Sequence, residues 1–390
     1  VYLMLPREPL AAPLSEPIAP IKPRAQAAPA HADPKSIATL AEWIAAAERP
    51  LIITSALPAA AVPLLAHLAE RCAIPVVTHN PRTLCMPSNH PLHFGFEPGA
   101  LLADADLVIA LETDVPWMPS LTHPPAGCHV AHVGEEPFYV RYPMRSFPSD
   151  LAVQAGPVQA LEALTAAVEA RLQMAEARIA SRRARLTERM RLRRAQLAKE
   201  AAPAAHISPE YLSHAIGEAF GEDAVIVNEY PLRPDHCARE KPDTFFALGP
   251  AGGLGWGFGA ALGVKLAKPD NFVVATLGDG AYMFSNPMVG HWVSSAQGLP
   301  ILTIVFNNSR YGAVRRATLS MFKDGAAGET DGRLLADIEQ APAYEAMAQA
   351  QGAYAERVEK PADLPDALVR AREAVVGGKR QALLNVITPY

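Results

Sequence analysis

The most constraining feature of the sequence is a strand, a helical stretch and a second strand between residues 272 and 306. Residues 272–277 and 301–306 are short, almost continuous apolar runs, which is the pattern of strands buried on both faces. Residues 287–297 lie between them and have the spacing of a helix. A crossover of this kind makes its two strands parallel. The chain is therefore predicted to contain a parallel sheet covered by helices.

Polar residues follow both strands of this unit. Gly278-Asp279-Gly280 comes directly after the first strand, and Asn307-Asn308 comes after the second. The carboxyl ends of parallel strands meet at one edge of a sheet, where open α/β sheets bind ligands. The carboxylate of Asp279, the amide oxygen of Asn308 and the carbonyl of Arg310 are oxygen ligands of the kind that Mg²⁺ prefers. The glycines beside Asp279 permit a tight turn and a close approach of N–H groups to a phosphate. Two ordinary strand-end turns are the alternative.

Alternating strands and helices run through two long parts of the chain. Residues 36–170 and residues 206–390 are each predicted to form a doubly wound parallel sheet, so the fold class is α/β with two such domains. The predicted strands cover residues 51–54, 75–78, 107–111 and 129–133 in the first domain, and 224–227, 272–277, 301–306 and 382–387 in the second. The predicted helices include residues 37–47, 60–71, 210–220 and 364–375.

The segments outside these domains differ in composition. Residues 158–200 are predicted to be one long helical region, and residues 171–205 are a charged helical linker that joins the domains. We interpret its many arginines as the solvated face of a connecting helix, with a surface for anionic ligands as the alternative. Residues 6–34 are rich in Pro and Ala, which is typical of an extended linker. Residues 1–6 are predicted to form a buried strand.

Charge and cysteine content narrow the functional classes. The formal net charge is −5, so nothing in the composition points to a nucleic-acid or membrane partner. No apolar run is long enough to cross a membrane. The four cysteines are scattered without C-x-x-C spacing, which predicts neither a zinc site nor a disulfide framework. Reduced thiols in a cytoplasmic protein are the expectation.

The glycine-rich stretch at residues 251–263 suggests a rival function. Gly255, Gly257 and Ala260 match the loose form of a dinucleotide-binding fingerprint, so a nicotinamide- or flavin-binding oxidoreductase is one hypothesis. That fingerprint should follow a strand directly, and the upstream residues 244–248 are only a weak strand.

Together, Gly278-Asp279-Gly280 and Asn307-Asn308 resemble the cofactor motif of the thiamine-diphosphate-dependent enzymes. The resemblance implies that Asp279, Asn308 and the carbonyl of Arg310 bind Mg²⁺, which clamps the diphosphate. The gap from Asp279 to Asn308 looks about two residues longer than in the commonest version of the motif, and an insertion around Asn286 would absorb it. The glycine-rich stretch also resembles the family's, with Leu254 where a bulky residue props the cofactor into a V shape. The implied cofactor-binding residues are Gly253, Leu254, Gly255, Gly278, Asp279, Gly280, Ala281, Asn308, Arg310, Tyr311 and Gly312.

Within the family, Gly252 to Gly255 and Asn307 to Arg315 look most like the benzoylformate decarboxylase and acetolactate synthase branch. That branch carries small hydroxyl residues near the diphosphate, where this sequence has Pro231 and Leu232. Either backbone groups take over from those hydroxyls or affinity for the diphosphate is reduced. His123 lies near where the branch presents a substrate-side histidine, and its role is left open.

The resemblance also implies an activity and an assembly. Residues 36–170 correspond to the family's central domain, as a scaffold, and residues 206–390 correspond to its diphosphate- and Mg²⁺-binding domain. Residues 1–35 correspond to the end of an N-terminal pyrimidine-binding domain plus a linker. The activating glutamate is expected on that absent domain or on a separate subunit, so no catalytic residue is assigned. The implied function is a homo-oligomeric decarboxylase or carboligase of 2-keto acids, inactive as this chain alone. A non-catalytic subunit on the same fold is the other alternative.

Overall fold

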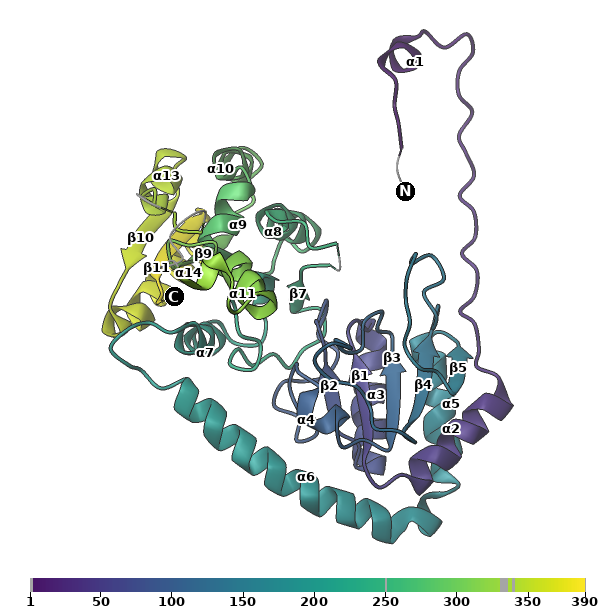
Figure 1. Cartoon of the computed structure of the whole chain (residues 1–390). Helices are drawn as coiled ribbons and strands as arrows, with labels where there is room; N and C mark the ends of the chain where they lie inside the picture. The colour runs from purple at the N-terminus through teal and green to yellow at the C-terminus, as the bar shows by residue number, and fades with distance from the viewer. Residues whose placement is uncertain (1–2, 250, 330–335, 339–340, 390) are drawn as a thin grey trace.

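The computed structural model describes residues 3–249, 251–329, 336–338 and 341–389. Within these residues the chain forms two parallel sheets, each flanked by helices, and a long helix that runs from one α/β unit to the other (Figure 1). The predicted fold class, two doubly wound parallel-sheet domains joined by a charged helix, is confirmed.

The first sheet has, in the described residues, five parallel strands in the order β2–β1–β3–β4–β5. Its strands are β1 (Pro50–Thr54), β2 (Val76–Thr78), β3 (Leu107–Leu111), β4 (His129–Gly134) and β5 (Leu151–Gln154). All residues of β1, β2 and β3 are buried, as expected for central strands with helices on both faces. The four predicted strands of this domain are confirmed. Strand β5 was not expected, because it is short and lies at the edge with only Val153 buried.

The second sheet has six parallel strands among the described residues, in the order β10–β11–β9–β8–β6–β7. Its strands are β6 (Val225–Glu229), β7 (Phe245–Ala247), β8 (Val273–Gly278), β9 (Leu302–Asn307), β10 (Tyr354–Val358) and β11 (Ala382–Ile387). The four predicted strands correspond to β6, β8, β9 and β11. The two edge strands carry weaker patterns: β7 has three residues, and Glu356 and Arg357 interrupt the apolar pattern of β10.

The order of the second sheet reverses between β6 and β8. From β6 the chain continues to β7 on one side, and from β8 it continues to β9 on the other. A reversal of this kind leaves a crevice beyond the carboxyl ends of the two strands. In this chain those ends are Glu229 and Gly278.

Helices cover the sheets and connect them. They are α1 (Arg7–Ala11), α2 (Pro34–Ala46), α3 (Val62–Cys72), α4 (Gly99–Leu102), α5 (Pro157–Glu169), α6 (Leu172–Glu200), α7 (Pro209–Phe220), α8 (Trp256–Ala267), α9 (Asp279–Phe284), α10 (Pro287–Ala296), α11 (Gly312–Met321), α12 (Ala326–Glu329), α13 (Tyr344–Ala350) and α14 (Leu364–Val376), with 3₁₀ turns at Ala59–Ala61 and Pro361–Asp363. The start of α7 is typical: Ser208 accepts a hydrogen bond from the N–H of Tyr211, and proline is the first helical residue.

The predicted single helical region at residues 158–200 is two helices, because α5 ends at Glu169 and α6 begins at Leu172. Helix α6 does connect the two units, as predicted, but its arginines are not all solvated. Arg182 is buried, and its guanidinium donates to the carbonyls of Ile44 (2.7 Å), Cys72 (2.9 Å) and Ala47 (3.1 Å). These carbonyls lie at the C-terminal ends of α2 and α3, which carry partial negative charge.

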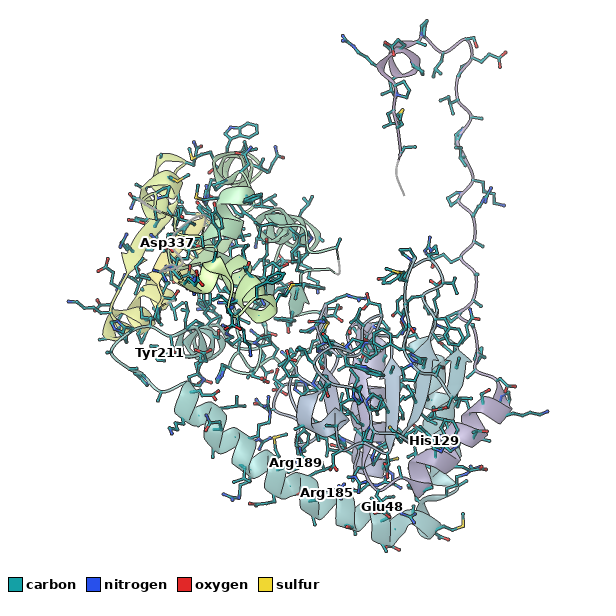
Figure 2. All side chains as sticks on the ribbon, viewed as in Figure 1. Glu48, His129, Arg185, Arg189, Tyr211 and Asp337 are labelled. Atoms are coloured by element: carbon teal, nitrogen blue, oxygen red, sulfur yellow. The ribbon has the colours of Figure 1, made fainter. Side chains whose placement is uncertain are left out.

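Other arginines of α6 bind the same region. Arg183 donates to the carbonyl of Glu70 and Arg185 to that of Glu48, both at 2.8 Å. Figure 2 shows Arg185 reaching from α6 toward Glu48. The arginine-rich pattern therefore attaches the helix to the first domain, and the contacts are local carbonyl groups that sequence spacing does not reveal.

The two α/β units also contact each other directly through a loop of the first. The edge strand β7 is covered by a segment of the first domain: Ala247 donates its N–H to the carbonyl of Arg82 (3.0 Å), and Thr83 pairs antiparallel with Phe246. Ser88 in turn donates to the carbonyl of Arg239 (2.9 Å). Covering an edge strand removes its unpaired backbone groups from solvent.

The start of the chain differs from the expectation. Residues 3–6 form no strand and are exposed, and residues 1–2 lie outside the described part. A strand needs a neighbour to satisfy its backbone, and the described residues place none there. The extended linker predicted for residues 6–34 is interrupted at its start by the short helix α1 (Arg7–Ala11), and most of residues 12–33 is extended and exposed (Figure 1).

The structure also bears on cysteine pairing and on membrane-spanning helices. The four cysteines are unpaired, as expected without a disulfide framework. Among the described residues, no helix combines the length and apolar character needed to span a membrane.

Candidate functional site

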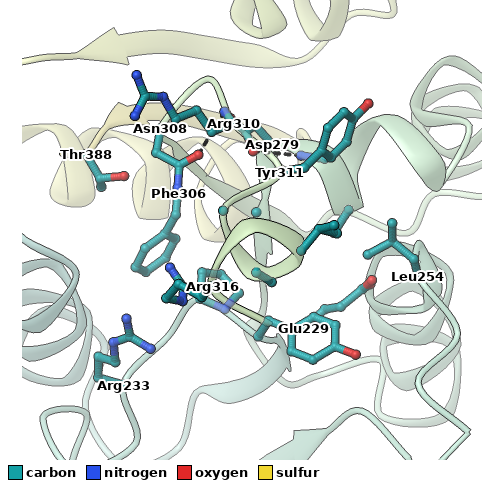
Figure 3. Close-up of a pocket in the computed structure, with 18 residues that line it drawn as sticks. Glu229, Arg233, Leu254, Asp279, Phe306, Asn308, Arg310, Tyr311, Arg316 and Thr388 are labelled. Atoms are coloured by element: carbon teal, nitrogen blue, oxygen red, sulfur yellow. Dashed lines mark hydrogen bonds between the residues drawn. The ribbon is translucent and has the colours of Figure 1, made fainter. Parts of the chain in front are cut away.

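A pocket lies beyond the carboxyl ends of the second sheet, at the reversal of strand order (Figure 3). Its empty space, including the open mouth, is about 770 Å³. The residues that line it come from the ends of β6, β8, β9 and β11 and the loops that follow them, from the starts of α9 and α11, and from the glycine-rich stretch before α8. They are Glu229, Tyr230, Pro231, Arg233, Leu254, Gly278, Asp279, Gly280, Ala281, Phe306, Asn308, Arg310, Tyr311, Gly312, Ala313, Val314, Arg316 and Thr388.

Asp279 is the buried acid of this pocket. It is the first residue of α9 and only 3% exposed. One carboxylate oxygen accepts the N–H of Gly280 (2.8 Å), and the other faces the N–H of Arg310 (3.3 Å). Burial raises the pKa of Asp279, and the backbone hydrogen bonds only partly offset that effect. A buried carboxylate of this kind favours a bound cation.

The loop after β9 brings Asn308 to the same place. The Oδ1 atom of Asn308 accepts the N–H of Arg310 (2.9 Å), which is the N–H that also faces Asp279. The oxygens of both side chains therefore converge on one point. Asn307 fixes the loop, because its Nδ2 donates to Asn385 (3.0 Å) and its Oδ1 accepts from the N–H of Ser309 (3.0 Å). Juxtaposition of the predicted oxygen ligands is thus a property of the fold.

The glycines beside Asp279 have a different reason from the one predicted. Neither Gly278 nor Gly280 has a positive φ, and α9 starts directly at Asp279 rather than after a tight turn. A Cβ on Gly280 would lie 2.9 Å from Cδ1 of Tyr311. Close packing of this ring, and not turn geometry, requires the glycine at position 280.

The glycine-rich stretch forms the opposite wall. Leu254 lines the pocket and is 42% exposed. Gly255 has φ +88° and caps α8, and a Cβ there would lie 2.8 Å from the backbone of Phe284. Leu254 is therefore held between the pocket and a tight contact of α8 with the end of α9.

Glu229 anchors this stretch from the end of β6. Its two carboxylate oxygens accept the N–H groups of Gly255 and Gly257, each at 2.6 Å. Burial raises the pKa of Glu229, and these two hydrogen bonds act in the opposite direction. In a dinucleotide site the N-terminus of this helix would bind a pyrophosphate. Here the side chain of Glu229 takes that position, which argues against the fingerprint interpretation of Gly255, Gly257 and Ala260.

The two glycines around Leu254 should respond differently to substitution. We expect Gly255→Ala to destabilise the chain by about 2–4 kcal/mol. The alanine would have to adopt a left-handed backbone conformation, and its Cβ would clash with the backbone of Phe284. Gly253→Ala has no heavy atom within 4 Å of the new Cβ and no positive φ, so its stability should match that of the parent or exceed it by up to about 1 kcal/mol. Urea denaturation of both variants measures the difference, and equal midpoints would contradict the packing described.

The structure gathers most of the residues predicted from the sequence. Nine of the eleven predicted cofactor residues line the pocket. The other two, Gly253 and Gly255, are the sequence neighbours of the lining residue Leu254. Their roles as ligands stay predictions. Glu229 and Thr388 were missed, although both stand at strand ends and the strand-end rule would have found them. Arg233 and Arg316 do not stand at strand ends, so that rule would not have predicted them. His123 is exposed in a loop of the first domain and is not among the lining residues.

The lining residues suit a Mg²⁺–diphosphate group. Asp279, Asn308 and the carbonyl of Arg310 offer oxygen ligands only, as Mg²⁺ prefers. In the described residues no cluster of three or more His, Cys, Asp or Glu forms a metal site of another kind.

Comparison with known families decides the identity. The model of the thiamine pyrophosphate enzyme central domain matches residues 37–164, and that of the C-terminal TPP binding domain matches residues 234–386. This chain belongs to the thiamine pyrophosphate enzyme family. The second match contains Leu254, Asp279 and Asn308, and the family implies thiamine diphosphate as cofactor, with Mg²⁺ as the usual partner metal. The resemblance inferred from the sequence is confirmed.

Several curated proteins are similar to this thiamine pyrophosphate enzyme. Acetolactate synthase of Mycobacterium bovis is 31% identical over 170 residues, which are 43% of this chain and 27% of that protein. Glyoxylate carboligase of Escherichia coli O157:H7 is 25% identical over 373 residues, 89% of this chain and 60% of that protein. "Probable 2-ketoarginine decarboxylase AruI" of Pseudomonas aeruginosa is 26% identical over 302 residues, 74% and 51% of the two chains. The chain thus spans a quarter to three fifths of the lengths of these relatives.

The fold also has solved counterparts. Benzoylformate decarboxylase from Polynucleobacter necessarius superposes with a TM-score of 0.73 at 20% identity, over 96% of this chain and 68% of that chain. At this identity the similarity establishes the fold of the thiamine pyrophosphate enzyme and leaves its substrate to chemical argument.

Proposed function

We propose that this chain anchors the cofactor of a decarboxylase or carboligase that acts on 2-keto acids with thiamine diphosphate and Mg²⁺. The observation that carries the proposal is the convergence of Asp279 Oδ2 and Asn308 Oδ1 on the N–H of Arg310, at 3.3 and 2.9 Å. The relatives support it, since their names describe a decarboxylase, a carboligase and an acetolactate synthase. Thiamine diphosphate, when bound, supplies an electron sink for carbanions.

The residues of the chain divide the work. Asp279, Asn308 and the carbonyl of Arg310 hold Mg²⁺ and, through it, the diphosphate. Leu254 presents an apolar side chain to the pocket from the opposite wall, where it would pack against the apolar part of the cofactor. Glu229 keeps Leu254 in place through the N–H groups of Gly255 and Gly257.

Proton transfer needs an acid that this pocket does not offer. Glu229 and Asp279 are its only lining carboxylates among the described residues. Glu229 is held by two N–H groups, and Asp279 is assigned to the metal. We therefore propose that the activating glutamate comes from another domain or subunit, and that this chain alone turns over little substrate. A cytoplasmic homo-oligomer is the form we expect, and the unpaired cysteines agree with a reducing compartment.

Calorimetric titration tests the cofactor assignment. Thiamine diphosphate should bind the chain in the presence of Mg²⁺ and bind at least tenfold more weakly with EDTA, because the metal neutralises the diphosphate beside a buried carboxylate. NAD⁺ and FAD serve as controls and should not bind. Binding that ignores Mg²⁺, or preferential binding of a dinucleotide, would overturn the proposal.

A further inference from the structure

We propose that Arg233 and Arg316 bind the cofactor's diphosphate in this enzyme, in place of hydroxyl side chains on the loop after β6. The inference deepens the proposed function and rests on it. Both arginines line the same pocket as Asp279 and Asn308. In Figure 3 they lie on the side of the pocket that carries Phe306, Asn308 and Thr388, away from Leu254.

At the pocket, the loop after β6 offers an anion two side-chain donors, the hydroxyl of Tyr230 and the charged guanidinium of Arg233. Pro231 has no N–H, and neither Pro231 nor Leu232 has a polar side chain. The N–H of Leu232 is taken by Asn228 Oδ1 (3.2 Å), and the N–H of Arg233 is taken by Ser213 Oγ (2.9 Å). Backbone groups at positions 231–233 therefore cannot replace hydroxyl donors. The guanidinium of Arg233 is the strong donor that this part of the loop retains.

Arg233 is available for an exchange of partners. Its Nε atom lies 3.3 Å from Glu210, and both side chains are partly exposed, at 43% and 31%. An ion pair this accessible contributes little net stability. A diphosphate with Mg²⁺ in the same pocket would offer a denser charge and two or more acceptor oxygens, which a guanidinium fork matches well.

Arg316 approaches the pocket from α11. Gly312, Ala313 and Arg316 share one helix face through their spacing of three and four residues, and all three line the pocket. Within the described part of the chain, Arg316 is exposed and has no hydrogen-bond or ion-pair partner. The third cation of the lining, Arg310, is paired with Asp337 at 2.9 Å. Arg233 and Arg316 are thus the cations left to balance a diphosphate.

The inference is tested by titrating thiamine diphosphate, and separately inorganic pyrophosphate, with Mg²⁺ into the chain. We expect Arg233→Ala and Arg316→Ala each to weaken binding of both ligands about tenfold, and the double variant about 100-fold, as for the loss of charge-assisted hydrogen bonds. The double variant should also show a smaller fall in affinity with rising salt than the parent. Arg316→Lys should recover part of the loss. Arg370→Ala, an exposed arginine of the same domain that pairs with Glu356, is the matched control and should bind like the parent.

Each other outcome is decisive. Parent-like affinity of the double variant for both ligands, with Mg²⁺-dependent binding intact, overturns the inference and leaves the proposed function standing. A loss for thiamine diphosphate without a loss for pyrophosphate would also overturn it, because the contact would then lie elsewhere on the cofactor. Failure of the parent chain to bind either ligand would overturn both proposals.

Discussion

Replacing Asp279 by alanine is expected to weaken Mg²⁺-dependent binding of thiamine diphosphate by at least about 100-fold. Losing even an indirect partner of a bound metal typically costs about 10–100-fold, and Asp279 is the only carboxylate of the proposed ligand set. The aligned N–H of Arg310 would then face Asn308 alone. Calorimetric titration with and without Mg²⁺ measures the effect.

The buried carboxyl of Asp279 is also expected to affect the stability of the fold. Burial raises the pKa of Asp279, so the folded state disfavours its ionised form relative to the unfolded chain. A raised carboxyl pKa means that stability from this group falls as pH rises above its ordinary range, so its charge is a cost at neutral pH. Without ligand, Asp279→Asn should therefore melt at or above the temperature of the parent, while its cofactor binding is impaired. A variant that binds normally, or one that loses binding only because it unfolds, would contradict this account.

Replacing Arg182 by alanine is expected to lower the free energy of unfolding by about 3–5 kcal/mol, because three buried carbonyls lose a charged hydrogen-bond donor at about 1–3 kcal/mol each. The side chain is 1% exposed and serves the carbonyls of Ile44, Ala47 and Cys72. Removing it leaves those three carbonyls without their buried donor and weakens the attachment of α6 to the first domain, which Arg183 and Arg185 still support. For a domain of this size the loss corresponds to a fall in Tm of at least about 6 °C.

Arg191→Ala is the matched control for this prediction. Arg191 is on the same helix, but it is exposed, and within the described residues its one ion-pair partner is Glu188 on α6 itself. Its loss should move Tm by about 1 °C or less, since exposed pairs of this kind contribute little. Differential scanning calorimetry of both variants compares them directly. Equal Tm values would show that α6 is a solvated connector after all.

Much of the fold could be predicted because apolar periodicity is a local property. The runs at β1, β3, β8 and β9 are buried on both faces, so each is apolar throughout and visible in the sequence. The edge strands β5 and β10 were missed because one side of an edge strand is partly exposed and carries polar residues. The break between α5 and α6 was missed for a related reason: helical spacing continues across residues 170–171 although the chain turns there.

The sequence by itself determined that Asp279 and Asn308 stand at the ends of adjacent parallel strands, because one βαβ crossover specifies that arrangement. It also determined the family, through motifs that lie close together along the chain. Only the tertiary structure decided which distant groups share the site. Glu229 reaches the start of α8, and Arg233 and Arg316 face one pocket, from segments that are more than 25 residues apart in sequence. The same holds for α6, whose arginines meet carbonyls more than 100 residues away. Such contacts depend on how complete elements pack, and no local pattern of residues encodes them.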